Sequence, residues 1–199
     1  MITLSRPGPW LAVLLLVLAA GCSEPPPQFQ STDVTGMKLS GDFRLTDHNG
    51  KERTLSDFRG KAVVLFFGYT HCPDVCPTTM AELAAAMKQL GKDADRVQVL
   101  FVTVDPERDT ADLLAKYVPS FNPGFLGLRG SPEATAKTAK DFKIMYQKQP
   151  GATPETYTVD HSAGTYVFDP QGRLRLYVSY GRGAEVFAHD IALLLRARG

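Results

Sequence analysis

The most constraining feature of this chain is a continuous apolar run, residues 62–69, that leads directly into two closely spaced cysteines. A run of this length bounded by turn residues is typical of a strand buried on both faces. The segment after it, GYTHCPDVCP, places Cys72 and Cys76 just before a predicted helix from Pro77 to about Leu90. Proline is favoured at the first helical position, where its missing N–H is not needed. The sequence therefore predicts a strand–loop–helix unit with two thiols at the start of the helix.

Strand and helix patterns continue along the rest of the chain. A short hairpin is predicted around residues 43–50, before the apolar run. After the run we predict a strand at 97–104, helices at 110–118 and 132–142, a hairpin of strands at 165–168 and 173–178, and a closing helix at 184–198. This order predicts an α/β domain with a central sheet flanked by helices and an N-terminal hairpin extension. A thioredoxin-like fold fits the order, and the order alone leaves a flavodoxin-like fold open.

The N-terminal residues predict export and attachment to a membrane. Arg6 precedes an apolar run at 10–20, which is too short to span a bilayer, since a spanning helix needs about 20 residues. We therefore interpret 1–21 as a signal peptide, and Cys22, directly after Ala-Ala-Gly, resembles the lipidated first residue of a bacterial lipoprotein. The alternative is a secretory peptide cut nearby that leaves Cys22 as a free thiol. The predicted protein is extracytoplasmic, and lies on the periplasmic side of the membrane in a Gram-negative cell.

The polar, proline-rich stretch at 22–40 is predicted to be a flexible tether, and 41–199 the folded domain. Over the whole chain, 22 basic and 21 acidic residues give a net charge of +1. Residues 1–21 hold one arginine and no acid, so the part after them carries 22 − 1 = 21 basic and 21 acidic residues. A neutral chain without basic runs has no electrostatic footprint for nucleic acid, and that class is excluded.

The two remaining cysteines indicate a metal or redox site. A helix N-terminus carries unpaired N–H groups and partial positive charge, which stabilise the thiolate that binds metal or attacks disulfides. Thioredoxin-type oxidoreductases have two residues between their cysteines, whereas Cys72 and Cys76 have three between them. Thiolates select Cu(I), Zn(II) or iron–sulfur clusters. Because zinc and clusters want four ligands, the small number available here favours copper.

Four histidines are candidates for a third ligand. His48 and His189 are interpreted as solvated surface residues, and His71 is expected to shape the cysteine loop. His161 precedes the predicted C-terminal hairpin and follows a polar stretch, 147–158, that is expected to be a mobile loop. On pattern alone His161 is either a ligand or a structural loop histidine.

Three motifs in order resemble the Sco/SenC family of copper-binding proteins: GYTHCPDVCP at 68–77, VDPERDT at 104–110 and DHSAGTYVFDPQG at 160–172. The resemblance extends from about Gly41 to the C-terminus. It implies a thioredoxin fold, copper ligation by Cys72, Cys76 and His161, and help in assembling the dinuclear copper centre of cytochrome c oxidase. It also implies a membrane anchor, which in many members is a transmembrane helix rather than lipid.

The leading functional hypothesis is a metallochaperone. The cysteines would hold Cu(I), the histidine would add a harder donor that also accepts Cu(II), and copper would pass to the copper-bearing oxidase subunit, with other copper chaperones as further partners. The alternative is an enzyme, a thiol–disulfide reductase that uses Cys72 and Cys76 to keep that subunit's cysteines reduced. A peroxidase fits less well, because peroxidatic cysteines lie in a different loop motif with an activating arginine.

The resemblance suggests weaker roles for residues near the site. Asp74, between the cysteines, is either an outer ligand to Cu(II) or a carboxylate facing the helix dipole. Asp105 and Arg108 are expected to stabilise the loop after the second strand rather than to touch metal. Met80 is expected to belong to the core, as methionines on apolar helix faces usually do.

Overall fold

The computed structural model describes residues 27–39, 42–153 and 156–197. Its strands are β1 (Thr32–Asp33), β2 (Leu45–Asp47), β3 (Glu52–Arg53), β4 (Ala62–Gly68), β5 (Val97–Thr103), β6 (Leu126–Arg129), β7 (Tyr146–Gln149), β8 (Thr158–His161), β9 (Thr165–Phe168) and β10 (Leu174–Val178). Its helices are α2 (Val75–Leu90), α3 (Ala111–Phe121), α4 (Pro132–Asp141) and α5 (Ala184–Arg196), with short 3-10 helices η2 (Leu55–Phe58) and η3 (Gly91–Arg96).

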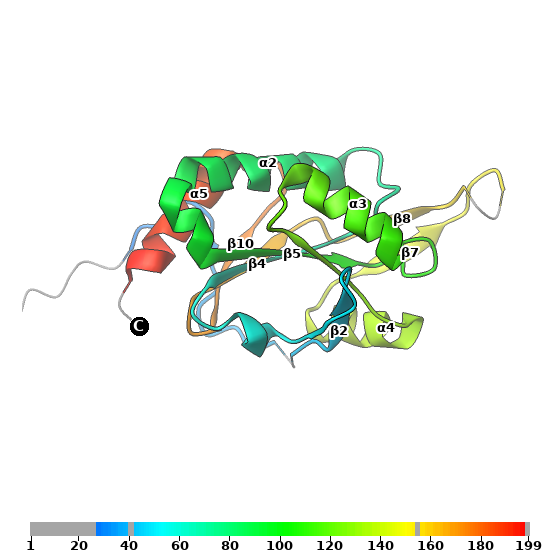
Figure 1. Ribbon diagram of the computed structural model, residues 1–199, viewed down its shortest axis with the longest axis horizontal. Helices are drawn as coiled ribbons and strands as arrows, with labels where there is room; N and C mark the ends of the chain where they lie inside the picture. The colour runs from blue at the N-terminus through cyan, green and yellow to red at the C-terminus, as the bar shows by residue number, and fades with distance from the viewer. Residues whose placement is uncertain (1–26, 40–41, 154–155, 198–199) are drawn as a thin grey trace, which may run out of the picture.

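Among these residues eight strands form one sheet, in the order β1-β10-β9-β4-β5-β6-β2-β3, and β7 pairs only with β8. Helices α2, α3 and α5 lie on one face of the large sheet and α4 on the other (Figure 1). Strands β4 and β5 are parallel, whereas β9 is antiparallel to β4 and β10 to β9. This mixed α/β architecture confirms the thioredoxin-like prediction. It argues against the flavodoxin-like alternative, whose doubly wound sheet is mostly parallel.

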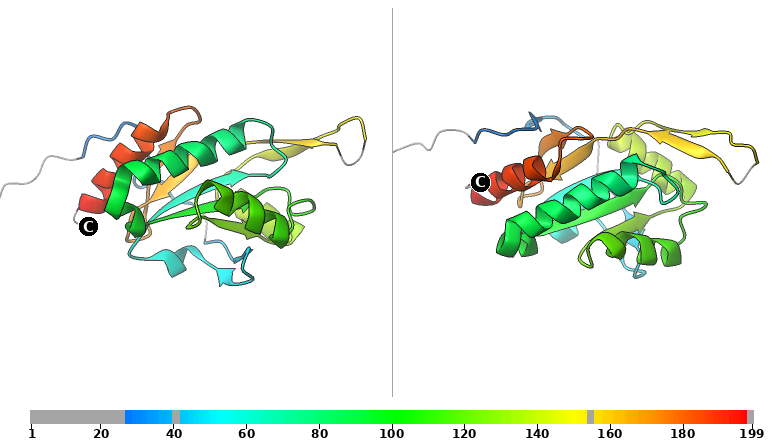
Figure 2. Two further views of the ribbon diagram at one scale, coloured as in Figure 1. Left: turned by 45° about the horizontal axis from the view of Figure 1, so that its top comes forward. Right: turned by 90° about the horizontal axis from the view of Figure 1, so that it is seen from above.

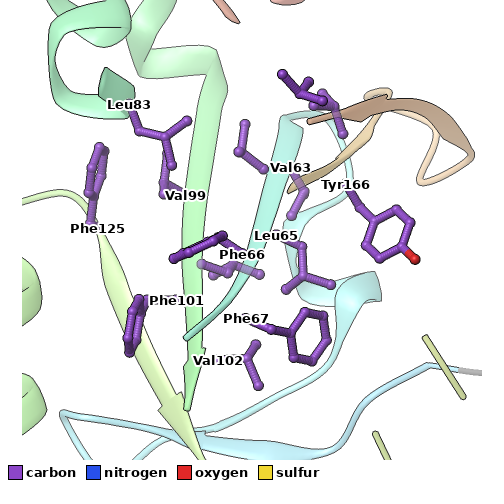
Figure 3. Packing of buried hydrophobic residues seen from close by; sticks show 14 of the residues in the cluster. Val63, Leu65, Phe66, Phe67, Leu83, Val99, Phe101, Val102, Phe125 and Tyr166 are labelled. Carbon is purple, nitrogen blue, oxygen red and sulfur yellow. The ribbon is translucent and has the colours of Figure 1, made fainter. Parts of the chain in front are cut away.

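The core forms on both faces of β4, every residue of which is buried. Alternate side chains of a strand point to opposite faces, so β4 supplies both layers. Phe67 packs against Phe142, which follows α4, with ring centroids 5.6 Å apart. Phe66 lies on the other side of the strand, 6.1 Å from Phe101 of β5 (Figure 3). The apolar run at 62–69 is therefore the buried central strand that the sequence predicts.

Helix α2 begins two residues earlier than predicted, at Val75 rather than Pro77. The backbone carbonyl of Asp74 accepts the N–H of Thr78 at 3.1 Å and so closes the first turn. Proline is tolerated in that turn because the first N–H groups of a helix have no intrahelical partner. The earlier start puts Cys76 inside the first turn of the helix instead of before it.

Strand β6 was not predicted from the sequence. The strand is short, contains Gly127 and runs parallel to β5. A Cβ atom at Gly127 would lie 3.0 Å from Val118 and 3.1 Å from Leu114, so the glycine lets α3 pack closely on β6.

The prediction for His48 fails at this strand. Nδ1 of His48 accepts the N–H of Gly127 at 3.0 Å. The interpretation of His48 as a solvated surface residue is therefore wrong, because this half-buried side chain fastens the N-terminal hairpin, β2–β3, to β6.

The stretch 147–158, expected to be a loop, lies partly in strands. Its ends belong to β7 and β8, which pair antiparallel with Tyr146 opposite His161. The two strands form an arm that extends from the body, at the end of the molecule far from the C-terminus (Figure 2). The loop prediction overlooked this pairing because the sequence of β7, YQKQ, carries little apolar signal.

The segment before the domain also differs from its expected form. Strand β1, within the stretch predicted to be a tether, pairs with β10. The buried carboxylate of Asp190 in α5 accepts the backbone N–H groups of Gln30 and Ser31 at 2.9 and 2.8 Å. Residues 29–35 therefore contact the domain. The predicted signal peptide and Cys22 lie outside the described residues, within which no helix has the length and apolar character needed to cross a membrane.

Candidate metal centre

The end of β4 makes room for a sulfur atom. A Cβ on Gly68 would lie 2.8 Å from Sγ of Cys76, closer than real Cβ atoms approach other atoms. Only glycine, which has no side chain, lets the first turn of α2 bring Cys76 this close to the strand. Cys76 is fully buried as a result, whereas Cys72, in the loop before the helix, is half-buried.

The two thiols have opposite ionisation behaviour. The side-chain hydrogen bond from Cys76 contributes most to lowering the pKa of Cys72, to about 5, against the opposing effect of burial. Backbone N–H groups add to this, and that of Cys76 lies 3.4 Å from the Cys72 sulfur. The pKa of Cys76 is raised far above its usual range, because Cys76 is the donor in this pair and is buried. At neutral pH the metal-free site therefore holds one thiolate and one thiol.

The third candidate ligand is the side chain of His161, which lies at the end of β8. Nδ1 of His161 lies 3.0 Å from the carbonyl oxygen of Ser162. Because a carbonyl can only accept, Nδ1 carries the proton and the lone pair lies on Nε2. Nε2 faces Sγ of Cys76 at 3.4 Å. The imidazole packs edge-on against Tyr69, with ring centroids 5.9 Å apart.

The ligand atoms of Cys72, Cys76 and His161 all lie within 4.8 Å of one another, and the group could hold a metal ion. Three donors at about 2.3 Å from one ion would be about 4 Å apart, so the spacing suits a three-coordinate ion. Two sulfur donors and one imidazole suit soft or borderline metals.

Other candidate residues lie outside this group. The side chain of His71 is half exposed and contacts the hydroxyl of Thr70 at 3.1 Å, which agrees with an effect on loop shape. His189 is an exposed residue bonded to Asp190, as expected for the surface. Met80 is fully buried in the core, as predicted. Asp74 occupies the N-cap position of α2 and accepts the hydroxyl of Thr78 at 3.3 Å, which favours the helix-start interpretation.

The loop after β5 has a larger structural role than the sequence indicated. Asp105 and Arg108 do stabilise this loop, through an ion pair of 2.5 Å. Both also contact Tyr157, the residue just before β8, which the sequence analysis overlooked. Asp109, equally overlooked, is a buried carboxylate that accepts the hydroxyls of Thr70 and Thr103, each at 2.6 Å.

An open cleft of about 480 Å³ adjoins the three residues. Its lining comes from the cysteine loop and from β8 with the residues after it: Tyr69, Cys72, Pro73, Asp74, Val75, Thr158, Val159, Asp160, His161 and Ala163. Since Cys76 is buried and Cys72 lines the cleft, a partner in solution would reach the site from the Cys72 side.

Comparison with known proteins gives consistent matches. The profile of the SCO1/SenC family matches residues 32–196. The mitochondrial protein SCO2 homolog of Bos taurus is 44% identical over 153 residues, which are 76% of this chain and 58% of the bovine protein. The chain therefore spans somewhat more than half the length of that curated relative.

Two solved structures extend the comparison. Bradyrhizobium japonicum ScoI, solved with copper bound, is 42% identical, with a TM-score of 0.71 over 79% of this chain and 99% of that one. A SCO1/SenC family lipoprotein from Bacillus anthracis is 26% identical, with a TM-score of 0.70 over 84% of this chain and 99% of that one.

Proposed function

Because the chain belongs to the SCO1/SenC family, we propose that it is a metallochaperone that binds copper and delivers it to the dinuclear copper centre of cytochrome c oxidase. The proposed ligands are Cys72, Cys76 and His161. The observation that carries this proposal is the approach of His161 to two cysteines 85 or more residues away, to within 4.8 Å. Copper in the Bradyrhizobium relative supports the choice of metal.

The donor set favours Cu(I), which is stable with two thiolates and one further ligand. Cu(I) would meet the Cys72 thiolate first, because that sulfur lines the cleft and is ionised at neutral pH. Cys76 would lose its proton on binding the ion, and Nε2 of His161 would complete the site. The imidazole also gives the site a harder donor for Cu(II).

Delivery would follow the same path in reverse. Thiolates of the oxidase's copper-bearing subunit would enter the cleft and replace Cys72 first, since the buried Cys76 is shielded. The same cleft could receive copper from other copper chaperones. Ligand exchange of this kind keeps the ion bound throughout the transfer.

A thiol–disulfide reductase is the second candidate, and the pKa of Cys72 favours it specifically. A thiolate with a pKa of about 5 can attack a disulfide of the target, which releases one target thiolate and forms a mixed disulfide. The Cys76 sulfur then attacks Cys72, forms the Cys72–Cys76 disulfide and releases the second target thiol. This reaction makes no use of His161 as a ligand.

His161→Ala separates the two functions. Zinc sites with four ligands bind with roughly 10–16 kcal/mol, or about 3 kcal/mol per ligand. We therefore expect this variant to bind Cu(I) about 100-fold more weakly, at an unchanged stoichiometry of one copper per chain. The measurement is a competition titration of the reduced protein against a Cu(I) chelator under anaerobic conditions.

The control is the rate of disulfide exchange with a model disulfide, measured for the wild-type protein and for His161→Ala. Equal copper affinity in both proteins, together with fast exchange, would make the protein a reductase and would exclude His161 from the ligand set.

We further propose that the protein is extracytoplasmic and anchored by lipid on Cys22, after removal of residues 1–21. The lipoprotein from Bacillus anthracis supports this form of attachment. Cells that express the full chain should hold it in the membrane fraction, and Cys22→Ser should release it. Retention of the variant in the membrane would contradict the lipid anchor.

A further inference from the structure

The position of His161 depends on an arm that is separate from the large sheet. Strand β8 ends at His161 and pairs only with β7 among the described strands. The arm formed by these two strands projects from the body of the domain (Figure 2). Contacts between this arm and the body must therefore help to decide where the imidazole lies relative to the cysteines.

Three residues form a polar contact between the arm and the body. The hydroxyl of Tyr157 donates to the fully buried carboxylate of Asp105 at 2.6 Å. Arg108 pairs with the other oxygen of the same carboxylate at 2.5 Å and donates to the backbone carbonyl of Tyr157 at 2.8 Å. Its guanidinium also lies over the Tyr157 ring, 3.5 Å from the centroid. The side chain and the backbone of Tyr157 are thus both held, four residues before His161.

The contacts continue toward the metal centre. The guanidinium of Arg108 lies 5.8 Å from the ring centroid of Tyr69, and that ring packs edge-on against His161. An ion pair of 2.7 Å between Lys148 of β7 and Glu107 joins the arm to the same loop, but both side chains are largely exposed. Since exposed ion pairs contribute little, the contacts at Tyr157 contribute more than this ion pair does.

We propose that Asp105, Arg108 and Tyr157 form a latch, and that these positioning residues hold the arm so that His161 reaches the cysteines. The proposal rests on the proposed function, since it takes His161 as a copper ligand. The latch acts on copper only through His161. When the latch is weakened, the arm moves away from the body more often and takes His161 out of the site. Only the two cysteine ligands then remain, so copper is bound less tightly.

Tyr157→Phe tests the latch, because it removes the hydroxyl and leaves the ring over Arg108. Partners outside the ligand shell typically change metal affinity 10- to 100-fold. We expect the full chain with Tyr157→Phe to bind Cu(I) about 10-fold more weakly and to show a changed absorption spectrum with Cu(II). The matched control is Tyr180→Phe, which removes the same hydroxyl from an exposed residue in the loop after β10.

A double-mutant cycle separates positioning from a general loss of stability. If the latch acts through His161, the affinity of Tyr157→Phe/His161→Ala equals that of His161→Ala alone. A further loss of affinity in the double variant would overturn the latch. So would a Tyr157→Phe affinity equal to that of wild type while His161→Ala weakens binding.

A second readout needs no copper. In the metal-free, reduced protein, amide hydrogen exchange at Thr158–His161 should become faster in Tyr157→Phe and faster still in Tyr157→Leu, with unchanged exchange in β4. Unchanged exchange at Thr158–His161 in both variants would overturn the latch even if His161 proved not to be a ligand. An affinity unaffected by His161→Ala, with faster exchange in the Tyr157 variants, would instead contradict the proposed ligand set alone.

Discussion

Replacing Cys76 by alanine is expected to remove tight Cu(I) binding and to raise the pKa of Cys72. The ion would lose one of two thiolate ligands, which by the zinc comparison costs at least about 3 kcal/mol, so the affinity should fall by more than roughly 100-fold. The loss should be larger than that for His161→Ala, because thiolate is the ligand that Cu(I) prefers. Anaerobic competition against a Cu(I) chelator measures the difference.

The effect on Cys72 follows from the hydrogen bond between the two sulfurs. That bond contributes most to lowering the pKa of Cys72 to about 5. Without it the pKa of Cys72 should move up toward the ordinary thiol value of about 8.5. In wild type the rate of Cys72 alkylation should level off above about pH 6, whereas in Cys76→Ala it should keep rising to a higher pH.

Cys76→Ser is the matched control, since a serine hydroxyl still donates to the Cys72 thiolate but is a poor ligand for Cu(I). It should lose copper as Cys76→Ala does and keep a low pKa at Cys72. Both variants are best made in a Cys22→Ser chain, so that one reactive thiol remains. Copper binding by Cys76→Ala within tenfold of wild type would contradict the assignment of Cys76 as a ligand.

The part of the candidate site formed by Cys72 and Cys76, which are close in sequence, could be predicted from the sequence. A strand, a short loop and a helix are adjacent along the chain, so the pattern at 62–90 alone places Cys72 and Cys76 near a helix N-terminus. The error of two residues at the start of α2 is of the usual size for helix boundaries. It matters here because it puts Cys76 in the first turn and under the cover of β4.

The position of His161 beside the cysteines could not be predicted from local patterns. His161 reaches the cysteines only after the chain has passed through β7 and β8, and the polar sequence of these strands gives no periodic signal. The resemblance of the DHS motif to the family, rather than any property of His161 itself, indicated its role. Tyr157 was missed for the same reason, because its partner Asp105 lies 52 residues earlier.

The short strands show a similar limit. Strands β1 and β6 have two and four residues, too few for an alternating pattern to stand out. Their positions depend on partners far along the chain, β10 for one and β5 and β2 for the other. Tertiary pairing of this kind determines strand structure where local propensity is weak.

Asp109→Ala is expected to have the largest effect on stability of the variants considered, because one carboxylate satisfies three donors between two loops. It accepts the N–H and the hydroxyl of Thr70 and the hydroxyl of Thr103. Alanine would leave these groups without an acceptor, at roughly 1–3 kcal/mol for each that stays buried. We expect a loss of about 3 kcal/mol, or a fall of about 10 °C in the melting temperature. Thr70 lies two residues before Cys72, so Cu(I) affinity should fall as well.

Asp109→Asn separates the hydrogen bonds from the charge. Its amide keeps one oxygen acceptor for Thr70, and its NH₂ group can donate to the hydroxyl of Thr103. Burial raises the pKa of Asp109, so the folded state binds a proton more tightly than the unfolded state does. The charged carboxylate therefore costs stability at neutral pH, and this cost disappears as the pH falls below the unfolded pKa. Asparagine lacks this cost, so Asp109→Asn should melt close to wild type at pH 7 and well above Asp109→Ala. Equal melting temperatures for the asparagine and alanine variants would mean that the charge, rather than the hydrogen bonds to Thr70 and Thr103, holds the cysteine loop in place.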